Sequence, residues 1–308
     1  MSLVSRRTAL KVLAGGGLGS LATGQSAQAS EALPTPPADA VAMLFDSTIC
    51  TGCKACVVAC TDANNLPPDT KMSGGIWQMP LDLNSETKNI IKLCQDPAKP
   101  ENFSFVKHQC MHCLDPACVS ACPFHALNKG AKGVVAWDGS LCIGCRYCEV
   151  ACPFEVPKFE WDRFNPKIVK CEFCNHRLKE GFEPGCTSVC PTGAVVFGKR
   201  DDLLTRAKAR ITDHPGRYFE SRVYGEKDAG GTQVLYLSGA PFKSIGLPDV
   251  PQYSLAGYAT SVHKFLYKWM LIPAAVYGLL VAIMRRRWKV HQVTAAREEA
   301  ETGLKEQL

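Results

Sequence analysis

The sequence predicts an α+β fold built from repeated cysteine-bearing units, followed by one C-terminal transmembrane helix. Three observations lead to this prediction. All but one of the 17 Cys fall into four groups, a short β-type stretch follows three of those groups, and a long apolar segment lies near the C-terminus. At 308 residues, with 46% hydrophobic and 21% charged residues, the chain is globular and long enough for a sizeable core.

The charge of the chain gives no reason to expect nucleic acid as a partner. The formal net charge is +6, but this number treats every Cys as neutral. If most Cys are metal-bound thiolates, the loaded protein is more acidic than that. No long basic stretch with interleaved aromatic residues is present in the sequence either.

Residues 1–29 have the features of a twin-arginine signal peptide. Arg6 and Arg7 precede a Gly-rich, weakly apolar stretch, and Ala27–Ala29 forms a small-x-small cleavage site. Ala9 stands where such signals usually carry Phe. The route resembles the one that exports proteins already folded with their cofactors. We therefore expect the domain that follows, residues 30–258, to reach the periplasm with its metal bound.

The four cysteine groups share one arrangement. Each has two close Cys, then a third, then a fourth that lies four residues after the third. Pro follows the last Cys in every group except the first, where Thr61 takes its place. The groups are Cys50, Cys53, Cys56 and Cys60; Cys110, Cys113, Cys118 and Cys122; Cys142, Cys145, Cys148 and Cys152; and Cys171, Cys174, Cys186 and Cys190.

The spacing of the first and third groups is that of bacterial ferredoxins. Closely spaced Cys on a loop can wrap three corners of an iron–sulfur cube. The fourth lies one helical turn beyond the third, so it reaches a second cluster instead. Gly52 and Gly144 allow the loops to fold tightly. Every group must therefore exchange one ligand with a partner group, but the spacing does not say which groups pair.

Two other uses of so many cysteines fit less well. Zinc sites use isolated Cys pairs separated by longer stretches. A disulfide scaffold suits an exported chain, but Cys residues two apart do not easily bridge each other, and the folded-export signal would be needless. No CxxC is followed by His, which excludes covalent c-type haem by its usual motif.

Short β-type stretches and a helix complete the predicted domain. Strands are expected within 133–137, 154–161 and 194–198, and an amphipathic helix over 201–211. Residues 64–108 read as an insertion. Its hairpin would use the stretches 89–93 and 103–108, with Cys94 as a free or buried thiol. His112, between two candidate ligands, is expected to be a satisfied loop residue, or else a hydrogen-bond partner that tunes a cluster.

Residues 262–284 are the predicted transmembrane helix, and residues 285–308 the cytoplasmic tail. Only Lys268 interrupts the apolar run 265–284, which at 1.5 Å per residue spans roughly 30 Å. Arg285–Arg287 follow it directly, so the positive-inside rule places the tail in the cytoplasm. The stretch 248–258 reads as a linker before this helix.

The four cysteine groups resemble those of the iron–sulfur subunits of respiratory complexes such as formate dehydrogenase, dimethyl sulfoxide reductase and polysulfide reductase. That resemblance covers roughly 43–198. The stretches "MLFDSTICTGCKAC", "GCRYCEVACPFEVPKF", "YGEKDAGGTQVL" and "LYKWMLIPAA" look most like the ferredoxin-like subunit of the hydrogenase-2 type. The family is built from two interlocked two-cluster modules, so the resemblance implies that fold here, with the hairpin insertion and the membrane helix added.

In that family groups one and four share two clusters, and groups two and three share the other two. Carried over to this sequence, the resemblance implies four 4Fe–4S clusters with four Cys ligands each. Cluster 1 would take Cys50, Cys53, Cys56 and Cys190; cluster 2 Cys60, Cys171, Cys174 and Cys186; cluster 3 Cys110, Cys113, Cys118 and Cys152; and cluster 4 Cys122, Cys142, Cys145 and Cys148.

The resemblance further implies an electron carrier without a primary catalytic site of its own. Electrons would pass from the small and large catalytic subunits of a hydrogenase to an integral membrane, quinone-reactive subunit. The chain would sit in the inner membrane with the cluster domain in the periplasm. Two alternatives remain at this point, namely the iron–sulfur subunit of a formate dehydrogenase or other molybdopterin oxidoreductase, and a structural, cysteine-rich membrane-anchored protein.

Overall fold

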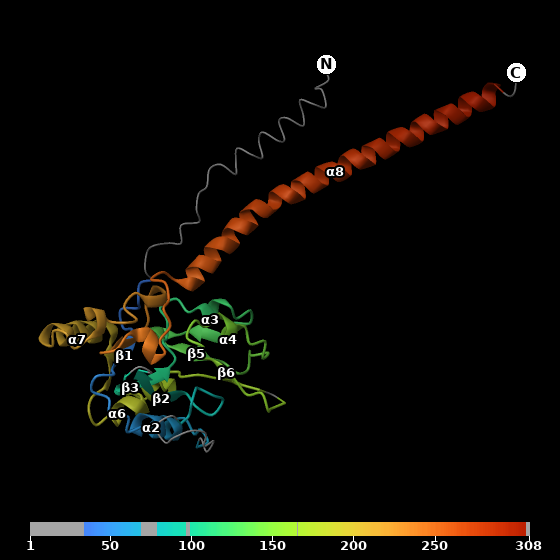
Figure 1. Cartoon of the computed structure of the whole chain (residues 1–308). Coiled ribbons are helices and arrows are strands. Elements are labelled where there is room, and N and C mark those ends of the chain that lie inside the picture. Colours follow the sequence, from blue (N-terminus) through green and yellow to red (C-terminus); the bar gives the residue numbers. More distant parts are fainter. Residues whose placement is uncertain (1–33, 69–78, 97–98, 165, 306–308) are drawn as a thin grey trace. The chain divides into compact units, whose positions relative to one another are not determined.

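The computed structural model describes residues 34–68, 79–96, 99–164 and 166–305 (Figure 1). The predicted signal peptide lies outside these residues. The chain divides into two compact units. Ala29–Tyr258 forms one, and the other contains Ala259–Leu308. The mixture of helices and strands confirms the predicted α+β class.

A three-stranded sheet in the order β8-β1-β9 organises the first unit (Figure 1). Strand β1 (Val41–Asp46) pairs antiparallel with β8 (Val195–Lys199) and parallel with β9 (Val234–Leu237). Met43, for example, lies opposite Phe197 on one side and Val234 on the other. The sheet thus joins the beginning of the domain to two segments that come after the last cysteine group.

The two faces of this sheet have different partners because side chains alternate along a strand. Ala42, Leu44, Leu235 and Leu237 pack against helix α7 (Arg200–Asp213) and neighbouring residues. Met43, Phe45 and Tyr236 lie on the opposite face, in the core cluster that also holds Cys56 and Cys186. The sheet therefore separates a plain hydrophobic layer from the cysteine-bearing half of the unit.

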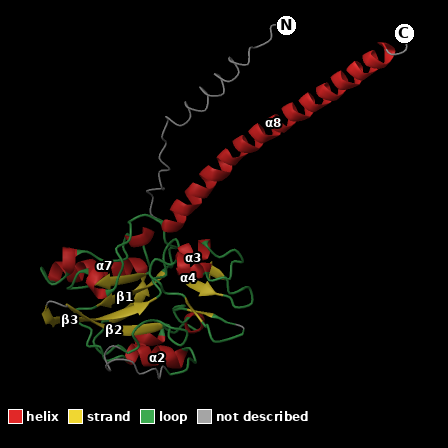
Figure 2. Cartoon of the chain, turned by 45° about the vertical axis from the view of Figure 1, so that its right-hand side comes forward, coloured by secondary structure: helices red, strands yellow, loops and turns green. Residues whose placement is uncertain are grey.

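The predicted insertion forms the expected hairpin. Strands β2 (Asn89–Asp96) and β3 (Lys99–Gln109) pair antiparallel, with Ile91 opposite Lys107 (Figure 2). Two small hairpins follow, β4 (Leu127–Lys129) with β5 (Val135–Trp137), and β6 (Lys158–Phe159) with β7 (Ile168–Val169). The β-type stretches predicted after cysteine groups two, three and four thus contain β5, β6 and most of β8.

Short helices carry the cysteine groups. They are α2 (Ala55–Ala63), α3 (Ala117–Ser120), α4 (Tyr147–Ala151), α5 (Asn175–Lys179) and α6 (Gly185–Ser188). Single 3-10 turns lie at η2 (Ala131–Gly133), η3 (Phe219–Ser221), η4 (Asp228–Gly230) and η5 (Phe242–Ile245). The predicted amphipathic helix is α7, whose Leu203 and Ala207 are buried.

The C-terminal part of the chain is the single helix α8 (Leu255–Lys305), which contains Pro273. The predicted linker 248–258 gives way to this helix at Leu255, and its first part is packed, since Ala229 N donates to Pro251 O. The apolar run 265–284 lies within α8, although the side chains of 265–272 are outside the described ones. Among the described residues, no helix is both long and apolar enough to cross a membrane.

Candidate metal centre

The four cysteine loops repeat one backbone conformation. The residue before the second Cys adopts the left-handed region in every group, with φ of 69° at Gly52, 47° at His112, 71° at Gly144 and 54° at Phe173. This region is strained for residues with a β-carbon. Its recurrence at His112 and Phe173 shows that the loop geometry overrides the local preference. The first and second Cys of each group are thus presented by the same tight reversal.

A second repeated turn follows the last Cys in groups two, three and four. His125, Glu155 and Gly193, each three residues after that Cys, have positive φ, and their N–H groups donate to the Cys carbonyl. The turn aims backbone amides at sulfur. Burial raises the pKa of Cys152 to about 11, while the amides of Val156, Phe154 and Glu155 act in the opposite direction. Pro in this turn has no N–H to satisfy and cannot continue the preceding helix.

Group one lacks the Pro and departs from this pattern. With Thr61 after Cys60, helix α2 continues through Ala63, one turn beyond the Cys. Helices α4 and α6, in contrast, end before the last Cys of their groups. The substitution noticed in the sequence therefore has a structural consequence, which is an added helical turn next to Cys60.

Helix packing brings the groups together in pairs. Helix α2 of group one contacts α6 of group four, and α3 of group two contacts α4 of group three. Gly185 makes the first contact possible, because a β-carbon there would lie 2.9 Å from Ala59 O. Figure 1 shows α2 and α6 side by side, away from α3 and α4.

Two cavities are each lined by four cysteines from two different groups. One is lined by Cys50, Cys53 and Cys56 of group one together with Cys190 of group four. The other is lined by Cys142, Cys145 and Cys148 of group three together with Cys122 of group two. These are the cysteines named above for clusters 1 and 4.

The cysteines named for clusters 2 and 3 lie deeper. Burial, followed by the charges of Cys60, Cys186 and Cys110, raises the pKa of the Cys171 thiol. Burial, followed by Cys110 and Cys152, raises that of Cys118 to about 12. Cys60, Cys171, Cys174, Cys186, Cys110 and Cys118 are buried, whereas Cys53 and Cys145 are exposed. Cys113 and Cys152 of the third set are partly exposed, so each outer set has one exposed Cys and neither inner set has any.

Contacts between the sets follow one linear order. Cys56 of the first set interacts electrostatically with Cys60 of the second, and Cys171 of the second with Cys110 of the third. Cys118 of the third interacts with Cys148 of the fourth. These interactions link the four named sets in the order one, two, three, four.

The thiol environment fits iron–sulfur clusters. Burial raises the pKa of Cys50 and Cys148 to about 11 and of Cys186 to about 12, so these groups stay protonated near neutral pH unless a cation stabilises the thiolate. Iron supplies that charge, and soft thiolates are its ligands in such clusters. Within the described residues no three acidic, His or Cys side chains form a site for a single ion. In a cluster each thiolate binds a different iron, so one shared ion is not the expected geometry.

A buried lysine compensates charge between the first two sets. Lys107 is fully buried, and its Nζ donates to Gln109 Oε1 at 2.6 Å. Although burial lowers its pKa, the charges of Cys186, Cys56, Cys60 and Cys171 raise it overall. A cation without solvent needs counter-charges, and the thiolates provide them. Nothing in the sequence around Lys107 signals this role, because it lies on a strand that reads as part of a hairpin.

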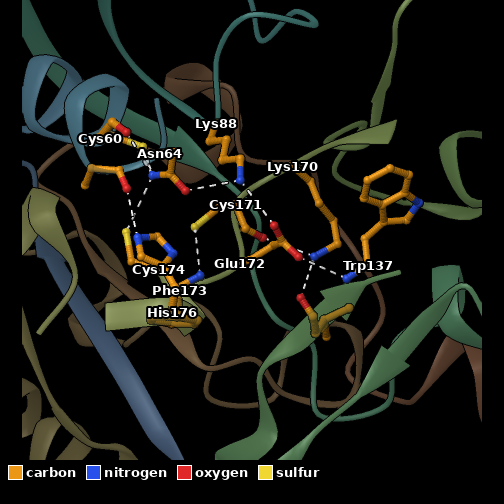
Figure 3. A network of polar contacts seen from close by, with 12 residues as sticks. Cys60, Asn64, Lys88, Trp137, Lys170, Cys171, Glu172, Phe173, Cys174 and His176 are labelled. Carbon is orange, nitrogen blue, oxygen red and sulfur yellow. Dashed lines mark hydrogen bonds and ion pairs between the residues drawn. The ribbon is translucent and has the colours of Figure 1, made fainter. Parts of the chain in front are cut away.

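A polar network surrounds the second set (Figure 3). Asn64, at the end of α2, lies within hydrogen-bond range of Cys60 Sγ and Cys174 Sγ. Lys88 contacts both Asn64 and Glu172, and Trp137 N donates to Glu172 Oε1 at 3.0 Å. An Asn at a helix end reads from sequence as an ordinary cap, so this network was not predicted.

His112 and Cys94 have structural surroundings. His112 is fully buried, its Nδ1 accepts from Val135 N at 3.0 Å, and its ring packs on Phe173 with centroids 4.1 Å apart. Its Nδ1 is satisfied but its Nε2 is buried without a hydrogen-bond partner among the described residues, so the prediction of a satisfied loop residue holds at one nitrogen only. Cys94 lies on β2 opposite Ser104, partly buried against the hydrophobic core.

Comparison with known proteins agrees with this chemistry. Residues 101–200 match the 4Fe–4S dicluster domain. The chain is 37% identical over 319 residues to the hydrogenase-2 operon protein HybA of Escherichia coli O157:H7, covering 93% of this chain and 96% of that protein. It is 34% identical to the iron–sulfur subunit of the nitrate-inducible formate dehydrogenase of Escherichia coli strain K12, covering 80% and 85%, respectively. The formate dehydrogenase iron–sulfur subunit of Haemophilus influenzae is 34% identical over 250 residues, covering 78% and 76%.

Proposed function

Because the chain belongs to the HybA-type family of iron–sulfur electron-transfer subunits, we propose that it relays electrons through four 4Fe–4S clusters from a nickel–iron hydrogenase to a quinone-reactive membrane subunit. The linear order of the four cysteine sets carries the proposal. When bound, the clusters would supply one-electron centres. The chain itself would act by holding these centres close together and setting their surroundings.

The proposed ligands of each cluster come from two groups. Clusters 1 and 2 would join groups one and four, and clusters 3 and 4 would join groups two and three, as two interlocked modules. The contacts of α2 with α6 and of α3 with α4 support this pairing. So do the two cavities lined by Cys190 with group one and by Cys122 with group three. Each cluster then has four Cys ligands.

Clusters 1 and 4 would be the two ends of the relay. Cys53 and Cys145 are exposed, so both end clusters would lie near solvent and within reach of partner proteins. Apolar side chains also face outward beside these ends. Val58 is 69% exposed next to group one, and Tyr147 and Val150 are 62% and 88% exposed on α4. Exposed apolar side chains next to a redox centre suit docking of a partner.

We further propose that the domain works in the periplasm. The twin-arginine signal and the apolar segment 262–284 followed by Arg285–Arg287 support a single-pass protein of the inner membrane with a cytoplasmic tail. Electron entry would come from the hydrogenase catalytic subunits, and electrons would leave toward the integral membrane subunit.

The similarity to formate dehydrogenase iron–sulfur subunits favours a second candidate function. In that case the same row of clusters would accept electrons from a molybdopterin catalytic subunit. Purification of the intact membrane complex separates the two, because the co-eluting catalytic subunit contains nickel in one case and molybdenum in the other.

Metal content tests the proposal directly. Anaerobically purified protein should be brown and carry about sixteen irons per chain, since each of the four proposed 4Fe–4S clusters holds four irons. In the intact complex, loss of a middle cluster should abolish electron transfer from hydrogen to quinone but spare hydrogen oxidation with an artificial dye. Zinc in place of iron, or a colourless protein, would reject the relay.

A further inference from the structure

The missing Pro of group one removes the backbone donors that the other turns supply. After Cys152 and Cys190 the chain turns and aims amides at sulfur. After Cys60 the chain continues as helix α2, where each backbone N–H donates to a carbonyl one turn earlier. The sulfur of Cys60 therefore depends on side-chain donors: Asn89 is one of them, and the helix end offers a place for a second donor.

Asn64 is positioned to be that donor. It lies at the end of the added helical turn, and its Nδ2 is 3.6 Å from both Cys60 Sγ and Cys174 Sγ. The same nitrogen donates to Cys60 O at 2.8 Å. An amide carries two N–H groups, so one can serve the carbonyl while the other is shared by the two sulfurs.

The orientation of the amide follows from its other neighbour. Lys88 Nζ lies 3.1 Å from Asn64 Oδ1 and 3.1 Å from Glu172 Oε2. An ammonium group donates only, so the amide oxygen must face Lys88 and the nitrogen must face the sulfurs. Glu172 in turn holds Lys88 and accepts from Trp137 N. Figure 3 shows these side chains converging from three separate segments.

We propose that Asn64 is a hydrogen-bond donor that raises the reduction potential of cluster 2, and that the Lys88–Glu172 ion pair is its positioning device. A hydrogen bond to thiolate sulfur stabilises the more negative, reduced state of a cluster. Asn64 thus replaces, by a side chain, the backbone amides that follow Cys152 and Cys190. The inference rests on the proposed function, since it requires that Cys60 and Cys174 bind the same cluster.

An electron paramagnetic resonance redox titration of the whole complex tests the proposal. Cluster 2 is identified by the signal that Cys60→Ser perturbs. Asn64→Leu removes the donor without changing charge and should lower the midpoint potential of cluster 2 alone. Lys88→Met frees the amide but also removes a positive charge that acts on Cys60, so the positioning role is measured by the part of its downward shift that disappears in the Asn64→Leu background. Asn65→Gly is the matched control, because Asn65 is adjacent, exposed and already at positive φ, and it should change no potential.

Pulsed resonance after exchange into deuterated water gives a second readout. The wild type should show exchangeable protons coupled to cluster 2 from Phe173 N, which donates to Cys171 Sγ at 3.4 Å, and from Asn64 Nδ2, and Asn64→Leu should lose only the Asn64 coupling. An unchanged potential in Asn64→Leu with full iron, an equal shift in Asn65→Gly, or no Asn64 coupling in the wild type would overturn the inference. If Asn64→Leu fails to assemble, the loss of the Asn64 proton coupling in Lys88→Met decides. Absence of any cluster signal in the wild type would instead reject the proposed function.

Discussion

Gly185 on α6 faces the backbone of α2 so closely that a β-carbon on it would lie 2.9 Å from Ala59 O and 3.1 Å from Ala63 Cβ. Group one and group four are thus brought together by two helices that approach almost backbone to backbone. The contact places Cys186 near Cys60 and Cys56. The absence of a side chain at Gly185 is therefore required for proposed clusters 1 and 2, which groups one and four share.

We expect Gly185→Val to lose clusters 1 and 2 while clusters 3 and 4 persist. The added side chain must push α6 away from α2, and each of the two clusters takes one ligand from α2 and one from α6 or the residues directly after it, namely Cys56 with Cys190 and Cys60 with Cys186. Iron content should fall by roughly half, because two of four 4Fe–4S sites are disrupted. Gly130→Ala is the control, since Gly130 has a φ of −80° and its nearest contact is Val134 O at 3.8 Å. Full iron in Gly185→Val would contradict the expectation.

Much of the domain could be predicted from local sequence signals. The β2–β3 hairpin and α7 follow from alternation and helical periodicity, and the cysteine loops from spacing. The central sheet could not be predicted in this way. Strands β1 and β9 are far apart in sequence and pair in parallel, and the short apolar run of β9 is buried at every position. Such a run has no period that distinguishes a strand from a buried helix.

The candidate metal centre, like the fold, could be predicted from local sequence only in part. The ligands are visible as a pattern because their spacing reflects one loop. Asn64, Lys88 and Lys107 are not, because each acquires its role through contacts with residues from other segments. The replacement of Pro by Thr61 was visible, but its consequence depends on where the extra helical turn of α2 ends.

The ion pair at the end of β1 gives a stability prediction. Asp46 is 1% exposed, and Arg210 Nη1 lies 2.9 Å from its Oδ2. Arg210→Met removes the cation, but Tyr218 and Thr48 still donate hydrogen bonds to the buried carboxylate. The free energy of unfolding should therefore fall by about 3 kcal/mol, which is toward the low end for breaking a buried ion pair. The midpoint of urea-induced loss of cluster absorbance should fall. Arg206→Met, on the exposed side of the same helix, should leave it unchanged.

Exchange of one ligand between modules can be tested with two serine variants. Cys152→Ser should disturb cluster 3, because the harder alkoxide changes the potential or stability of the cluster it binds. Cys122→Ser should disturb cluster 4 in the same way. Resonance spectra of the two variants should therefore differ in which signal changes. If Cys152→Ser altered the signal of the cluster bound by Cys171 and left the signal of the cluster bound by Cys110 intact, the proposed pairing of the cysteine groups would be wrong. The proposed electron relay would not be contradicted by that result.

The same two variants separate a relay from an active site. Transfer from hydrogen to quinone should fall in both, since each interrupts the row of clusters. Hydrogen oxidation with a dye that accepts electrons at the catalytic subunits should largely survive. Loss of dye activity in an assembled Cys152→Ser complex would show that this chain takes part in the primary reaction, contrary to the proposal.

The last prediction concerns export and membrane topology, and its evidence is the sequence of the two ends of the chain. Arg6→Lys with Arg7→Lys should leave the unprocessed precursor in the cytoplasm, because the twin-arginine pair is what the export machinery reads. The same change should not reduce iron per chain if clusters are inserted before export. In spheroplasts of the wild type, external protease should digest the cluster domain and spare an epitope placed after Arg287, since the three Arg that end the apolar segment hold the tail inside. Digestion of the tail alone from outside would show the opposite orientation. Periplasmic activity of the Lys variant would show that export does not depend on the twin-arginine pair.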